Sequence, residues 1–174
     1  MARIAILTVS DRASRGEYED RGGPACEDWL RRVITSPVEI TRRITPDGRA
    51  EVATALCDLA DTWGADLILA TGGTGPSPRD QTPEAVADVI TFDLPGFGEA
   101  MRAANSRVVA TAILSRQGAG VRGKTLIITL PGSPNAISTS LEAVFAAVPY
   151  CLDLIGAARI ETDPALIKAH RPKV

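Results

Sequence analysis

The chain has 174 residues, of which 45% are hydrophobic, and it carries a net charge of −2 at pH 7. This length and composition predict one globular domain, residues 1–174, with a single sizeable core. The weakly acidic charge argues against nucleic acid as the main partner. The sequence has no signal peptide and no apolar run long enough to cross a bilayer, so we expect a cytoplasmic protein with no membrane partner. Its three scattered cysteines and single histidine form neither a zinc-ligand spacing nor a disulfide framework.

The first part of the chain predicts two strands separated by a helix. Residues 3–9 form an aliphatic run typical of a buried strand, and the polar residues Ser10 and Asp11 begin the loop after it. Apolar residues at helical spacing predict a helix over 24–33. Residues 38–44 alternate in polarity, as in a half-exposed strand that ends just before Asp47.

The middle of the chain predicts a helix, a buried strand and a glycine-rich loop. Residues 49–63 carry apolar side chains at helical spacing, and 66–70 are too short and too aliphatic to be anything but a buried strand. A loop over residues 71–80 follows this strand. Thr82 as N-cap and Pro83 at the first helical position then predict another helix.

One more buried strand is predicted at 125–130. Before it, residues 93–99 form a turn that leads into a short helix. The apolar stretch 108–114 has a pattern that does not decide between helix and strand.

After the last strand, the sequence predicts a long helical region. Ser133 is expected to cap it, Pro134 to open it, and Pro149 to break or kink it. From Thr162 onward we expect a short helix and a loose end.

Strands that alternate with helices predict an α/β fold: a three-layer domain with a mostly parallel central sheet flanked by helices. In such folds ligands bind outside the carboxyl ends of the strands. Four loops follow predicted strands and should meet at that edge; they begin at Ser10-Asp11, Pro46-Asp47, Thr71-Gly72 and Pro131-Gly132. Their convergence predicts a site without reliance on any one motif.

The glycine-rich loop is the strongest local indication of chemistry. Glycines at 72, 73 and 75, with the hydroxyls of Thr71 and Thr74, allow a tight turn that presents backbone N–H groups to an anion. Asp80 at the far end adds a carboxylate, which suggests a bound metal ion. The alternative is a structural turn that only joins a strand to a helix.

A second glycine-rich stretch, residues 118–125, matches the P-loop pattern by sequence alone. That motif works only where the glycines follow a strand and open a helix, so that amides face the phosphates. Here the glycines precede a strand. We therefore interpret the stretch as a turn leading into the strand at 125–130.

Taken together, these segments strongly resemble the molybdopterin adenylyltransferase family of molybdenum cofactor biosynthesis, and its MogA branch more than its MoaB branch. The resemblance extends over nearly the whole chain and is far more specific than one glycine loop. The matching segments are Ser10–Arg12, Pro46-Asp47, Thr71–Gly75, Arg79-Asp80, Thr82–Ala85, Leu94–Glu99, Ala112–Arg116, Leu130–Pro134 and Val148–Cys151.

The resemblance implies transfer of AMP from ATP to the terminal phosphate of molybdopterin, with release of pyrophosphate. It implies use of Mg²⁺, a homotrimer, and delivery of the product to the metal-insertion protein of the same pathway. Asp47 and Asp80 correspond to the two catalytic aspartates and would hold the metal. The residues implied to bind the substrates or their phosphates are Ser10, Asp11, Thr71, Gly72, Gly73, Thr74, Gly75, Ser115, Pro131, Gly132 and Ser133.

Two other functions fit the same resemblance. One is a non-catalytic protein that binds or carries molybdopterin, and the other is a nucleotide-phosphate hydrolase of the kind found in competence-damage domains. The presence of both aspartates and the full glycine loop favours the transferase. One departure is that Val144 and Phe145 are joined directly, where some members carry a longer segment, which bears on surface shape and subunit contacts rather than on chemistry.

Overall fold

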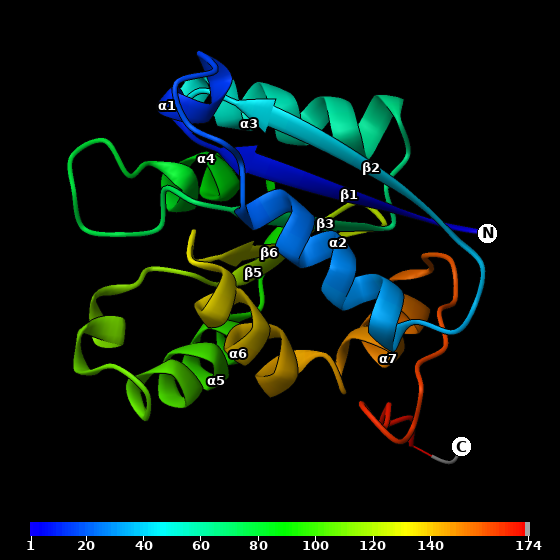
Figure 1. The fold of residues 1–174 in the computed structure, drawn as a ribbon. Helices are drawn as coiled ribbons and strands as arrows, with labels where there is room; N and C mark the ends of the chain where they lie inside the picture. Colours follow the sequence, from blue (N-terminus) through cyan, green and yellow to red (C-terminus); the bar gives the residue numbers. More distant parts are fainter. Residues whose placement is uncertain (173–174) are drawn as a thin grey trace.

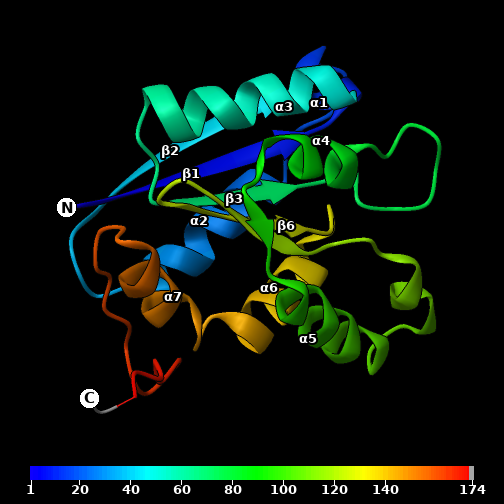
Figure 2. The ribbon, with the colours of Figure 1, turned by 180° about the vertical axis from the view of Figure 1, so that it is seen from behind.

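The computed structural model describes residues 1–172, in which six strands form one sheet with helices on both faces (Figures 1 and 2). The strand order is β2-β1-β3-β6-β5-β4. Four strands run parallel: β1 (Ala2–Val9), β2 (Val38–Thr45), β3 (Leu67–Thr71) and β6 (Thr125–Leu130). The short strands β5 (Ala119–Arg122) and β4 (Phe92–Asp93) are antiparallel to their neighbours. The predicted mostly parallel α/β fold is confirmed.

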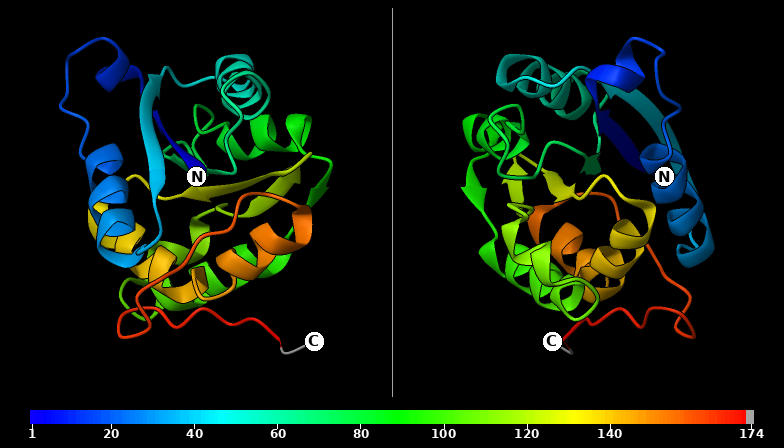
Figure 3. Two further views of the ribbon diagram at one scale, coloured as in Figure 1. Left: turned by 90° about the vertical axis from the view of Figure 1, so that its right-hand side faces the viewer. Right: turned by 60° about the vertical axis from the view of Figure 1, so that its left-hand side comes forward.

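Helices form the two outer layers, with the sheet between them (Figure 3). One face is covered by α3 (Arg49–Cys57), its π-helical continuation η1 (Asp58–Thr62) and α4 (Thr82–Val89). The other face is covered by α2 (Gly22–Val33), α5 (Pro95–Ser106), α6 (Pro134–Val144) and α7 (Val148–Ile155). Two short helices lie in connections: α1 (Asp11–Ser14) and the 3₁₀ helix η2 (Ala110–Leu114).

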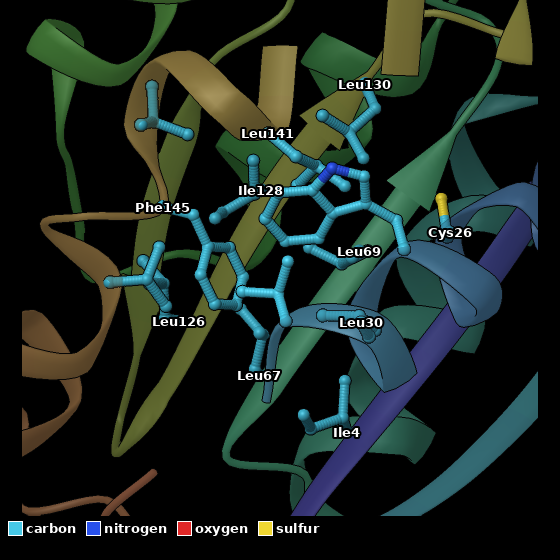
Figure 4. Close-up of a cluster of buried hydrophobic side chains, with 14 of the residues drawn as sticks. Ile4, Cys26, Leu30, Leu67, Leu69, Leu126, Ile128, Leu130, Leu141 and Phe145 are labelled. Atoms are coloured by element: carbon cyan, nitrogen blue, oxygen red, sulfur yellow. The ribbon is translucent and has the colours of Figure 1, made fainter. Parts of the chain in front are cut away.

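Successive residues of the central strands face two separate cores. In β1, Ile4 and Ile6 pack toward α2 and α6, whereas Ala5 and Leu7 pack toward α3 and α4. Burial on both faces is why this strand is an uninterrupted aliphatic run rather than an alternating one. Phe145 lies in the first core (Figure 4), where its ring is edge-on to Trp29 with centroids 4.8 Å apart.

The glycine-rich stretch before β6 was predicted as a turn, and most of it is strand. Residues 119–122 form β5, which pairs with β6 so that Gly120 lies opposite Ile127. Only Gly123 and Lys124 form the hairpin turn, with Gly123 at a φ of 56°. A Cβ at Gly120 would collide with Ile90 and lie only 3.1 Å from the carbonyl of Phe92, so this glycine allows β4 to approach.

Of the two predicted helix caps, the one at Thr82 is wrong and the one at Ser133 is confirmed in position only. Thr82 lies inside α4, where Gln81 holds the N-cap position, and its hydroxyl donates to the carbonyl of Gly72 at 2.9 Å. Ser133 does occupy the N-cap position of α6, but within the described residues its side chain makes no capping hydrogen bond. The Thr82 hydroxyl therefore ties α4 to the glycine loop, and the Ser133 hydroxyl remains available at the end of β6.

The predicted break at Pro149 is confirmed. Helix α6 ends at Val144, and α7 begins at Val148 with Pro149 in its first turn. None of the helices described in residues 1–172 is long and apolar enough to cross a membrane alone, although α6 and α7 meet that test together as a pair bent by 65°.

The segment after α7 differs from the predicted short helix and loose end. Over 162–172 the chain forms a bridge and one turn, with no helix in these described residues. Thr162 pairs with Ile34. Arg171 Nε donates to the carboxylate of Asp153 at 2.6 Å, and the amide of His170 donates to the carbonyl of Ala146 at 2.9 Å. These contacts attach the segment to the α6–α7 side of the molecule.

Candidate active site

The loops after the four parallel strands meet at one edge of the sheet, beside α1 (Figure 1). The pairing sets the strand ends level, because Val9 lies opposite Thr45 and Thr71 opposite Leu130. The loops that begin at Ser10, Pro46, Gly72 and Pro131 therefore leave the sheet side by side. This is the convergence that the parallel topology predicts.

Asp11 and Asp47 hold the first two of these loops together. The amide of Asp11 donates to Asp47 Oδ2, and the amide of Asp47 donates to Asp11 Oδ1, each at 3.0 Å. Arg79 reaches across from the glycine loop, with Nη2 2.5 Å from Asp11 Oδ2 and 3.6 Å from Asp47 Oδ2. The three loops are thereby linked through charge-assisted hydrogen bonds.

Asp47 and Asp80, the predicted catalytic pair and metal ligands, line the same cavity of about 450 Å³. We call it the carboxylate cavity; its lining residues are Val9, Ser10, Asp11, Arg12, Arg15, Glu17, Asp47, Ser77, Arg79 and Asp80. The Asp80 carboxylate is oriented by the amide of Ser77, which donates to Oδ2 at 3.1 Å. The sequence placed these two aspartates 33 residues apart, and the fold brings them to one cavity.

Glu17 and Asp11 in this cavity are paired with Arg15 and Arg79, whereas Asp80 has no ion pair in the described chain and Asp47 lies 3.6 Å from Arg79. Arg15 donates to Glu17 at 2.8 Å and holds the pKa of that carboxyl below its ordinary value, so these two groups neutralise each other. Among residues 1–172, no cluster of three or more His, Cys, Asp or Glu side chains could hold a metal on its own. Two carboxylates fit Mg²⁺, which commonly takes one or two from the protein and the rest of its ligands from water and substrate phosphates.

A second cavity of about 450 Å³ adjoins the first, and Ser10 and Arg12 line both. We call it the helix-end cavity; it is lined by Thr8, Val9, Ser10, Arg12, Ala13, Tyr18, Asp20, Arg21, Gly22, Thr71, Gly72, Gly132, Ser133 and Pro134. The N-terminus of α6 opens onto it, which places unpaired amides and the positive end of the helix dipole at its wall. The cavity is suited to an anion.

The glycine loop was predicted to present its backbone N–H groups to a phosphate, and only some of them are free to do so. The amide of Gly72 donates to the carbonyl of Leu130 at 3.1 Å, so this donor is already used. The amides of Gly73, Thr74 and Gly75 have no protein acceptor within the described chain and remain available. The loop therefore offers three free N–H groups to an anion, and the Gly72 amide instead links the start of the loop to the end of β6.

Two other predicted contact residues, Thr71 and Thr74, are held within the protein. The Thr71 hydroxyl donates to the carbonyl of Pro131 at 2.7 Å and joins the ends of β3 and β6. Thr74 is only 5% exposed, and it is absent from the described lining of both cavities. Gly132 and Ser133 line the helix-end cavity as expected.

Ser115 lies away from these cavities. It follows η2 and lines a separate cavity of about 500 Å³ between α4 and α5, together with Arg102 and Gln117. The structure therefore brings together Ser10, Asp11, Asp47 and Asp80 with the ends of β3 and β6, and leaves Ser115 apart from them in this single chain.

Sequence reasoning missed the contribution of residues 18–21. Arg12 and Arg21 both stack on Tyr18, with guanidinium carbons 5.0 and 5.9 Å from the ring centroid. Asp20 fixes this segment, because it accepts hydrogen bonds from the Thr8 hydroxyl at 2.9 Å and the Gly23 amide at 3.0 Å. The segment has no periodicity, and only its mixture of charged and aromatic residues after a strand could have indicated a role.

Residues 5–150 match the family described as a probable molybdopterin binding domain. The molybdopterin adenylyltransferase of Escherichia coli (strain K12) is 44% identical over 98% of this chain and 94% of its own length. That of Helicobacter pylori (strain J99) is 48% identical over 98% of this chain and 97% of its own length. This chain belongs to the molybdopterin adenylyltransferase family. The family predicted from the loop motifs is confirmed.

A solved structure supports the fold of this family member. The molybdopterin biosynthesis enzyme MoaB from Thermus thermophilus superposes with a TM-score of 0.81 and is 44% identical, covering 89% of this chain and 96% of that one. The four converging loops lie within the matched residues 5–150. The carboxylate and helix-end cavities are therefore features of the family domain in this chain.

Proposed function

We propose that this protein is a Mg²⁺-dependent molybdopterin adenylyltransferase that transfers AMP from ATP to the terminal phosphate of molybdopterin. The observation that carries the proposal is the pair of adjoining cavities. One holds Asp47 and Asp80, the other is bounded by the N-terminus of α6, and Ser10 and Arg12 lie where they join. Two anionic substrates bound in these cavities would meet at that boundary.

The reaction is a displacement at the α-phosphorus of ATP. An oxygen of the molybdopterin phosphate forms a bond to this phosphorus, the bond to the oxygen that bridges to the β-phosphate breaks, and pyrophosphate leaves. No covalent enzyme intermediate is required, so the protein has to bind, align and neutralise the two reactants. Because ATP is a substrate, we place the reaction in the cytoplasm.

Asp47 and Asp80 would hold Mg²⁺, which when bound supplies charge neutralisation at the phosphate oxygens. Asp11 and Arg79 hold the Asp47 loop in place through the hydrogen bonds described above. The free amides of Gly73 to Gly75 are preorganised donors for negative charge. Arg12 and Arg21, supported by Tyr18, would offset the charge of an anion in the helix-end cavity.

We further propose that the protein acts as a homotrimer and passes its product to the metal-insertion protein of the pathway. Apolar side chains are exposed along one side of the molecule at the end of α5 and in η2: Val108 is 76% and Ile113 70% exposed. An exposed apolar patch of this kind favours contact with another chain. Light scattering after size-exclusion chromatography would measure the assembly, and a monomer at working concentration would contradict this part of the proposal.

The test of the function is product analysis. The protein is incubated with molybdopterin, ATP and Mg²⁺, and adenylyl-molybdopterin and pyrophosphate are measured beside controls that lack each component. We expect both products only when all three components are present. Binding of molybdopterin without conversion would instead indicate a carrier, and ATP consumption without molybdopterin would indicate a hydrolase.

A further inference from the structure

Arg116 lies on the outer side of the glycine loop and makes four contacts with the loop and the helix that follows it. Its backbone amide donates to the carbonyl of Thr74 at 2.7 Å. Its side chain donates from Nε to the carbonyl of Gly75 at 3.0 Å and from Nη2 to the carbonyl of Asp80. Nη1 pairs with the carboxylate of Glu84 in the first turn of α4.

These contacts bridge the two ends of the loop segment 75–80. Within that segment the described hydrogen bonds are local, between Ser77 and Asp80 or Arg79, apart from the contacts of the Arg79 side chain with Asp11 and Asp47. Thr82 already ties the start of the loop to α4, because its amide donates to the carbonyl of Gly73 at 3.1 Å and its hydroxyl to that of Gly72 at 2.9 Å. Arg116 adds the contacts that hold Gly75 and Asp80, the two ends of segment 75–80, to each other and to Glu84 of α4. Its guanidinium is suited to this because its N–H donors lie in one plane and can serve two carbonyls and a carboxylate at once.

We propose that Arg116 is a positioning residue for AMP transfer, holding the ends of segment 75–80 so that the Asp80 carboxylate stays in the carboxylate cavity. It lies outside the lining of that cavity as the described residues define it, and it acts through Asp80 and the free amides of the loop. Glu84 is its anchor on α4. This inference rests on the proposed function, because it assigns Arg116 a part in the same reaction.

The chain offers a matched control in Arg122. This arginine is similarly exposed, pairs with a carboxylate, Asp61, at 2.6 Å, and donates to a backbone carbonyl, that of Val89, at 2.8 Å. It joins β5 to η1 and α4 and has no contact with segment 75–80. Arg116→Lys and Arg122→Lys each keep the charge and remove the planar fork.

The first measurement is amide hydrogen exchange of the ligand-free protein. We expect exchange in segment 75–80 to become about 10-fold faster or more in Arg116→Lys, because the segment opens more easily once no guanidinium bridges its two ends. Exchange in this segment should stay unchanged in Arg122→Lys.

The second measurement is steady-state kinetics. In Arg116→Lys we expect kcat to fall by about 10- to 100-fold and the Mg²⁺ concentration for half-maximal rate to rise, with the KM for molybdopterin unchanged.

Addition of guanidinium ion to Arg116→Ala should restore part of the lost rate, which a general loss of stability would not allow. Unchanged loop exchange in Arg116→Lys, or a faster loop with normal kcat and normal Mg²⁺ dependence, would overturn the proposal. A wild-type protein that forms no adenylyl-molybdopterin would overturn the function itself, and the exchange measurement distinguishes that failure from a failure of the Arg116 contacts.

Discussion

At Gly72 the backbone geometry of the site depends on a single residue type. Its φ is 103°, and a Cβ atom would collide with the carbonyl oxygen of Val9 at the end of β1. Its amide and carbonyl are both used, by Leu130 and Thr82. The residue therefore sets how closely the ends of β1, β3 and β6 approach one another.

Gly72→Ala should lower the free energy of unfolding by about 1 to 3 kcal/mol, because alanine is strained at this φ and has no space. Urea denaturation measures the loss. Gly96→Ala is the control, since Gly96 lies in α5 with open space around it and no positive φ. Equal stability of the two variants would contradict the role given to Gly72.

Cys26 lies in the core beside Asp20, and burial together with that charge raises the pKa of its thiol to about 12. The folded protein therefore keeps the thiol protonated where the unfolded chain, with a pKa near 9.0, would lose its proton. The contribution of this thiol to the free energy of unfolding is therefore fully present below pH 9 and declines as the pH rises above 9.

At pH 8 a thiol reagent should modify the partly exposed Cys57 well before Cys26, because Cys26 is both buried and protonated. Mass spectrometry of partially labelled protein gives the order of modification. Labelling of Cys26 at the rate of Cys57 in folded protein would show that this part of the core opens.

At the scale of elements, the sequence predicts three strands that are buried on both faces and one half-exposed edge strand. The runs in β1, β3 and β6 are aliphatic throughout, and alternation in β2 reflects its position at the sheet edge. Strand β5 escaped prediction because its four residues include Ala119 and Gly120 and gain strand geometry from pairing with β6. Strand β4 has only two residues, too few for any period.

The site residues likewise divide into those that the sequence could predict and those that depend on packing. Asp47, Asp80, Ser10 and Ser133 could be predicted, because strand order and loop position bring them to one edge. The use of the Gly72 amide and the burial of Thr74 could not, because both depend on how β3 and β6 pack. The separation of Ser115 depends on the path of η2, which has no strong sequence pattern.

An aromatic contact joins α2 to the end of α6. Phe145 is fully buried against Trp29. Phe145→Ala should lower the free energy of unfolding by about 3 to 5 kcal/mol, the usual cost of an aromatic cavity in a core. Leu154→Ala, at a side chain that is 68% exposed, is the control and should change stability by less than about 0.5 kcal/mol. Similar urea midpoints for both variants would contradict the assigned core.

For the whole molecule, ion pairs that join one element to another link pH to stability. Arg49 pairs with Asp88 and joins α3 to α4, and Arg122 pairs with Asp61 and joins β5 to η1. In each pair the hydrogen-bonded guanidinium lowers the pKa of the carboxyl below 3.8. Their contribution is present above pH 3.8 and is lost as the pH falls through the lowered values.

A variant with Asp61→Asn and Asp88→Asn should therefore melt at a lower temperature than wild type at pH 6, and the difference should shrink as the pH falls below 3.8. Because the pairs are exposed, the effect is small and 1 M salt should reduce it. Thermal melts across this pH range measure it. A difference that is constant from pH 6 to pH 3 would show that the lost interaction is not ionic.

The central claim is that one pair of carboxylates serves AMP transfer in the cavity where the strand ends meet. Asparagine at either position keeps the shape and an oxygen that can accept the amide of Asp11 or of Ser77, so Asp47→Asn and Asp80→Asn should fold as wild type.

The measurement is the rate of AMP transfer from labelled ATP to molybdopterin in the two variants, with molybdopterin binding and melting temperature measured in parallel. We predict that each rate falls by about 100-fold or more while binding and melting are retained, because charge stabilisation at the phosphates is lost. Transfer at the wild-type rate in either folded variant would contradict the assignment of these carboxylates and, with it, the proposed site.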